Sequence, residues 1–116
     1  MMRRICRSAM FVFGLGLLLG VPVLSGSALA AANPHVSEAV EHARDAASHG
    51  KEGHADACVQ HAEEALKHAM ASGAKNPHLD EGLKHLTEAV KHGKAGHAEA
   101  CTEHASGGAT HLAEVK

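Results

Sequence analysis

The sequence predicts an all-α fold, namely an antiparallel four-helix bundle built from two duplicated helical hairpins. Three observations support this prediction. Apolar residues recur at helical spacing, helix start and stop signals divide the chain into four segments, and the chain repeats itself after 43 residues. Four short helices that each carry one apolar stripe can bury all four stripes by packing against one another, as in a four-helix bundle.

The first 30 residues differ from the rest and are typical of a secretory signal peptide. Three arginines precede an apolar run over 11–24, and Ala28 and Ala30 offer the small side chains of a cleavage site. The run is broken by Gly and Pro and falls short of the ~20 residues of a membrane span. We therefore expect a signal peptide over 1–30, one domain over 31–116, a periplasmic or secreted location, and no membrane contact after cleavage.

The expected domain contains two copies of one unit, over 33–75 and 76–116. Each copy begins with Asn-Pro-His, in which Asn is a favourable N-cap and Pro fits the first helical turn. Gly50 and Gly93 each follow a histidine and are candidates for the residue that ends a helix. Together these signals predict helices over 34–49, 54–72, 77–92 and 97–115.

Many of the predicted core residues are alanines, so the helices can approach closely, but the buried apolar area and hence the stability should be modest. Ser106-Gly107-Gly108 interrupts the fourth predicted helix. Each glycine there costs roughly 1 kcal/mol relative to alanine. The sequence therefore leaves the continuity of this helix open.

Twelve histidines follow a seven-residue spacing, three in each predicted helix. Seven residues is close to two helical turns, so each trio lies along one face of its helix. Histidines seven apart are separated by ~10.5 Å along the axis, too far for both to form ~2 Å bonds to one ion. A second ligand must therefore come from the neighbouring helix. The twelve are His35, His42, His49, His54, His61, His68, His78, His85, His92, His97, His104 and His111.

An antiparallel hairpin places histidines of its two helices at matching heights. Residues at the same height have numbers that add to a constant, which is 103 in the first unit and 189 in the second. Imidazole is the commonest metal ligand in proteins, so this alignment predicts six metal-binding His–His rungs. They are His35–His68, His42–His61, His49–His54, His78–His111, His85–His104 and His92–His97.

Five acidic residues lie four positions before a histidine, where side chains on a helix are neighbours. This spacing assigns Glu38 to His42 and Asp45 to His49, and it gives five of the six rungs a carboxylate. Two imidazoles and one carboxylate suit Cu(II), Ni(II), Co(II) or Zn(II), and the Irving–Williams order favours copper. The five acids are Glu38, Asp45, Glu64, Glu81 and Glu88.

Composition and spacing disfavour other functions. Without the three signal arginines, eight basic residues face thirteen acidic ones, a balance that attracts cations and disfavours nucleic acid. A di-iron enzyme of the bundle class needs Glu-x-x-His, whereas these acids stand four residues ahead, so we expect no enzyme. A pH-responsive helical protein stays an alternative, because facing imidazoles repel when protonated. A metallochaperone that delivers copper to an unidentified protein partner is another.

Cys58 and Cys101 occupy equivalent positions in the two units. In an oxidising compartment they can form a disulfide between the hairpins. Two buried free thiols, or a Cu(I) site made from both thiolates, are the other possibilities. The sequence does not decide among the three.

The chain resembles the bacterial small metal-binding protein family over essentially the whole expected domain. That resemblance implies a periplasmic, histidine-rich four-helix protein that binds copper and other divalent ions for scavenging, buffering or delivery, with the twelve histidines as ligands. We expect it to be a monomer. The stretches that carry the resemblance are 35–42, 49–54, 61–68 and 85–92.

Overall fold

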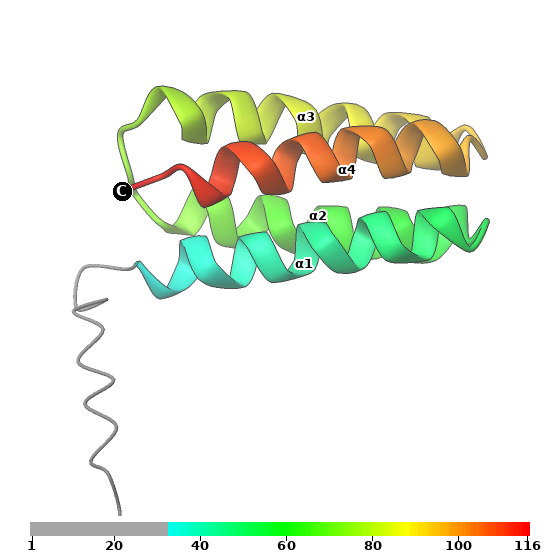
Figure 1. The fold of residues 1–116 in the computed structure, drawn as a ribbon, viewed down its shortest axis with the longest axis horizontal. Helices are drawn as coiled ribbons and strands as arrows, with labels where there is room; N and C mark the ends of the chain where they lie inside the picture. Colours follow the sequence, from blue (N-terminus) through cyan, green and yellow to red (C-terminus); the bar gives the residue numbers. More distant parts are fainter. Residues whose placement is uncertain (1–32) are drawn as a thin grey trace, which may run out of the picture.

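A computed structural model describes residues 33–116, which form an antiparallel bundle of four α-helices (Figure 1). The all-α bundle predicted from the sequence is therefore confirmed. The predicted signal peptide over 1–30 lies outside the described residues. The helices are α1 (Pro34–Lys51), α2 (Ala55–Ala71), α3 (Pro77–Lys94) and α4 (Ala98–Ala113).

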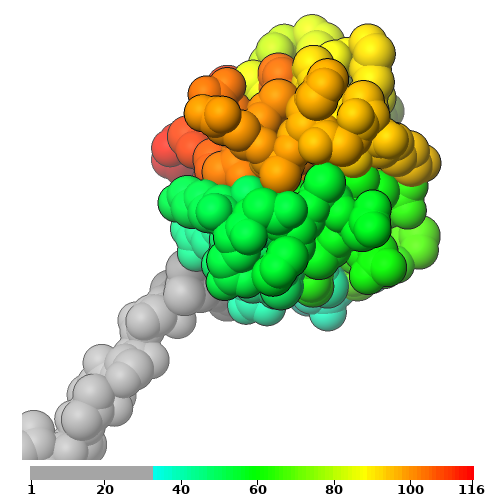
Figure 2. All heavy atoms as spheres, turned by 90° about the vertical axis from the view of Figure 1, so that its right-hand side faces the viewer, coloured from blue at the N-terminus to red at the C-terminus, as the bar shows by residue number. Residues whose placement is uncertain are grey.

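Consecutive helices pair into two hairpins, α1 with α2 and α3 with α4. The two hairpins stack on each other, so that α1 also packs against α4, and α2 against α3. Figure 2, which looks at the bundle from its hairpin-turn end, shows the second hairpin lying on the first. The α1–α2 seam and the α3–α4 seam are thus opposite sides of the bundle. No helix within residues 33–116 is long and apolar enough to cross a bilayer.

Helices α1 and α3 start as predicted and each continue two residues further. Helices α2 and α4 each start one residue later than predicted and end one and two residues earlier, respectively. Asn33 and Asn76 cap α1 and α3, each accepting a hydrogen bond on its side-chain oxygen from the backbone N–H two residues later. Gly50 and Gly93 do not end the helices as expected; both are buried within them. The turns instead contain Gly53 and Gly96, whose φ angles of 82° and 84° lie in the region that favours glycine.

The core consists mainly of alanine, as the sequence predicted. Its largest fully buried side chains are only Leu86, Leu112 and the two cysteines. Little apolar area per residue is therefore buried, and hydrophobic stabilisation scales with that area.

Helix α4 runs without a break through Ser106-Gly107-Gly108. A Cβ atom on Gly108 would lie 2.9 Å from Cγ of Leu86, and one on Gly82 would lie 2.9 Å from Cγ of Leu112. The two glycines thus let α3 and α4 approach closely enough to seat the two leucines. This packing offsets the low helix propensity of glycine.

Cys58 and Cys101 form a disulfide that links α2 to α4. Both cysteines are fully buried, and their Cα atoms are 6.5 Å apart. Of the three possibilities that the sequence left open, the structure supports the disulfide. The two sulfur atoms are therefore unavailable as the thiolate ligands of a Cu(I) site.

Replacing Gly93 by Ala should destabilise the bundle by about 1 kcal/mol. The added methyl would overlap Cγ2 of Val59 and come within 3.1 Å of Sγ of Cys101. Overpacking of this kind typically costs ~1–3 kcal/mol, and the ~1 kcal/mol that alanine gains over glycine in a helix offsets only part of that cost. Urea unfolding followed by circular dichroism measures the difference. Ser106→Ala on the exposed face of α4 is the control, and equal stability of both variants would contradict this packing.

Candidate metal centre

The histidines of each hairpin face one another across the seam between its helices. All six predicted pairs have adjacent rings, with centroid separations of 5.7–6.3 Å. In one of them, the Nδ1 atoms of His42 and His61 are 3.5 Å apart. The seven-residue spacing and the antiparallel register therefore place the rings as the sequence predicted.

Rings of successive rungs also contact one another, which the sequence reasoning missed. These diagonal pairs have closer centroids, at 5.0–5.3 Å, and their planes are within 16° of parallel. Each hairpin therefore carries one continuous zigzag of six imidazoles, here called a histidine ladder. These contacts join residues at different heights on the two helices, so pairing by equal height does not predict them. The diagonal pairs are His42–His68, His49–His61, His85–His111 and His92–His104.

The ladders lie at the surface. His35, His54, His78 and His97 at the ladder ends are exposed, and the other eight histidines are half-buried. Ions can therefore reach the rings from solvent without a change of fold.

Each rung of the α1–α2 ladder has one carboxylate beside its two histidines. In each of the three resulting groups, one ligand atom from every residue lies within 4.8 Å of the others. Modest side-chain rotations would bring two imidazole nitrogens and one carboxylate oxygen onto a single ion, a donor set that suits divalent transition metals. The groups are His35, Glu38 and His68; His42, Asp45 and His61; and His49, Glu52 and His54.

The assignment of acids to rungs was wrong by one rung for Glu38 and Asp45. Glu38 lies 2.8 Å from Nδ1 of His68 and 3.7 Å from Nδ1 of His35, rather than beside His42. A helical side chain leans toward the N-terminus of its helix, so it covers the preceding turn. The acid therefore reaches the histidine three residues before it.

The same spacing of three identifies Glu52, which the sequence reasoning missed. Its carboxylate lies 3.3 Å from Nδ1 of His54 and 3.8 Å from Nδ1 of His49. A search for acids three residues after a histidine would have found it.

The other three predicted acids pair with a lysine three residues later. Glu64 contacts Lys67 at 2.6 Å, and Glu81 contacts Lys84 at 2.7 Å. The hydrogen bond from the lysine, together with its charge, lowers the pKa of Glu64 and that of Glu81. Glu88 lies 3.5 Å from Lys91, and its predicted partner His92 is 3.9 Å away.

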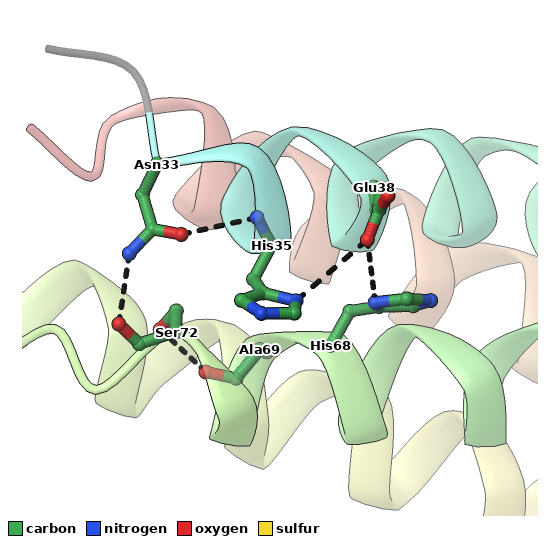
Figure 3. A network of polar contacts seen from close by, with 6 residues as sticks. All are labelled: Asn33, His35, Glu38, His68, Ala69 and Ser72. Atoms are coloured by element: carbon green, nitrogen blue, oxygen red, sulfur yellow. Dashed lines mark hydrogen bonds and ion pairs between the residues drawn. The ribbon is translucent and has the colours of Figure 1, made fainter.

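Figure 3 shows how the helix ends hold the first rung in register. The side chain of Asn33 caps α1 and also donates a hydrogen bond of 2.8 Å to the carbonyl oxygen of Ser72, just beyond α2. This contact ties the start of α1 to the end of α2. Glu38 then points between the rings of His35 and His68.

The fold and the site together define a class of protein, a helical bundle whose surface displays ladders of potential metal ligands. The sequence profile of the small metal-binding protein family matches residues 10–115. The chain belongs to the small metal-binding protein family, as its resemblance had indicated. A search among curated proteins found no match.

Proposed function

We propose that this protein buffers or scavenges divalent transition-metal ions in the periplasm, with Cu(II) favoured and Ni(II), Co(II) and Zn(II) as further cargo. The observation that carries the proposal is the pair of histidine ladders, in which twelve imidazoles form six facing pairs. Metal binding by the family supports the same function. The open surface and the repetition of similar sites fit storage better than catalysis.

Binding should approach about six ions per chain, and His42→Ala should remove about one of them. Histidines of one helix lie ~10.5 Å apart along its axis, so each ion must take its imidazoles from both helices of a hairpin, and the six facing pairs give about six sites. Calorimetric titration of the purified chain with Cu(II) and with Zn(II) measures the stoichiometry. Gln60→Ala, beside the ladder but without a metal ligand, is the control and should keep all the ions.

Other outcomes point to other functions. Loss of all binding in His42→Ala would indicate one cooperative site and contradict independent rungs. One dominant site in the unmodified chain would favour a metallochaperone. Negligible binding would leave the pH-responsive protein, whose stacked imidazoles separate when protonated.

A further inference from the structure

The two ladders have similar ring geometry but different access to carboxylates. Along α1–α2, each rung has a carboxylate within reach of both rings. No comparable group of three ligands occurs along α3–α4 in the described part of the chain. The difference follows from a few surface residues.

The residue three positions after each acid decides where its carboxylate lies. In α1, Glu38 and Asp45 are followed at this spacing by Glu41 and Ser48, which cannot donate a salt bridge, and both acids contact the ladder. The equivalent residues of α3, 43 positions later, are lysines, and these contact Glu81 and Glu88. The two lysines are Lys84 and Lys91.

The turns differ in a simpler way, because Ala95 occupies the position of Glu52. The backbones match closely: the residue that caps the first helix has φ −79° and ψ −1° in one turn and φ −81° and ψ 0° in the other. The histidines that follow, His54 and His97, also have matching dihedral angles. A glutamate at position 95 would therefore start from the same backbone as Glu52, next to the rings of His92 and His97.

We propose that the two ladders are distinct metal compartments, and that the α1–α2 ladder binds divalent ions before the α3–α4 ladder does. This inference rests on the proposed function. The first ladder offers three sites of two imidazoles and one carboxylate. The second offers pairs of imidazoles whose nearby acids contact lysines. At its turn, position 95 is alanine, and Glu88, which lies 3.9 Å from His92, also contacts Lys91.

The order of filling follows from charge and ligand number. A carboxylate adds a third ligand and a negative charge beside a dication, whereas a lysine places a positive charge near it. Surface ion pairs are weak, so the lysines should change the affinity only about twofold. The missing turn acid should have a larger effect, about tenfold, comparable with the loss of a supporting group at other metal sites.

A charge-neutral exchange tests the proposal on the whole chain. In Glu52→Ala/Ala95→Glu the composition is unchanged and only the location of the turn acid differs. Titration with Zn(II) at pH 7.5, followed by NMR of ¹⁵N-labelled histidine rings, reports which rings bind at each ratio of zinc to protein. Circular dichroism verifies that both proteins contain the same amount of helix.

In the unmodified chain, the rings of His49 and His54 should shift at about tenfold lower free zinc than those of His92 and His97. In the exchanged chain this order should reverse. Simultaneous filling of both turns, or the same order in both proteins, would overturn the inference while leaving metal binding intact. Absence of any histidine shift would overturn the proposed function itself.

A second pair of variants tests the role of the lysines. Lys84→Gln/Lys91→Gln should raise the zinc affinity of the second ladder about twofold by releasing its two acids. Lys75→Gln/Lys116→Gln makes the same change in net charge at two other lysines, both exposed, and should leave that affinity unchanged. Equal effects of the two pairs would show that net charge alone is responsible, which would contradict capture of the acids.

Discussion

Removing the disulfide, by Cys58→Ala/Cys101→Ala, should lower the free energy of unfolding by about 4 kcal/mol. The bond closes a loop of 43 residues, and chain-entropy estimates give about this value for a loop of that length. A domain of this size loses roughly 4–8 °C of melting temperature per kcal/mol, so the melting temperature should fall by on the order of 20 °C. This loss would be a large share of the total stability, because the core consists mainly of alanine.

Thermal unfolding of the metal-free protein by circular dichroism measures this change. Wild-type protein that is reduced in denaturant and refolded in the presence of reductant serves as the control. Its melting temperature should be close to that of the double variant, because both proteins lack the covalent link that the oxidised protein has. A reduced wild type that melts like the oxidised one would show that the disulfide contributes little.

Adding Cu(II) should raise the melting temperature strongly at pH 7.5 and hardly at all at pH 5. A ligand that binds only the folded state stabilises it by about 2.7 kcal/mol at a hundredfold excess over its Kd, which corresponds to on the order of 10 °C for one site. The unfolded chain keeps its histidines, so any binding to it reduces this shift.

The pH dependence follows from competition between protons and metal ions for the same nitrogens. Imidazole side chains as a class have a pKa of about 6.5. Protons compete more strongly at the lower pH, so we expect the ions to be released at pH 5. Melting curves with and without copper at the two pH values provide the measurement. Equal shifts at both would mean that histidine is not the principal ligand.

The ladder geometry could be predicted because it depends on two regular quantities, the helical period and the antiparallel register of a hairpin. His42 and His61 were paired from their numbers alone, and the structure places their rings side by side. Spacing alone could not predict that Glu38 contacts the His35–His68 rung rather than His42. This acid stands three residues after one histidine and four before the next. The lean of its side chain decides between them.

Helix ends and glycines were predicted less well, for a different reason. Gly50 and Gly108 look like helix breakers in a linear sequence, but in the bundle they lie where another helix comes closest. A Cβ on Gly50 would come within 3.0 Å of the carbonyl oxygen of Ala98. Such tertiary packing overrides local propensity, and it becomes visible only when the helices are placed together.

The separation of core and ladder has a consequence for how such a protein can change over generations. Stability depends on the buried alanines, leucines and valines and on the disulfide, whereas Ser48, Lys84 and Ala95 lie exposed on the outside. Substitutions at such outer positions are usually close to neutral for folding. Single surface substitutions can therefore change the metal affinity of each hairpin, while the helices that space the histidine rings stay the same.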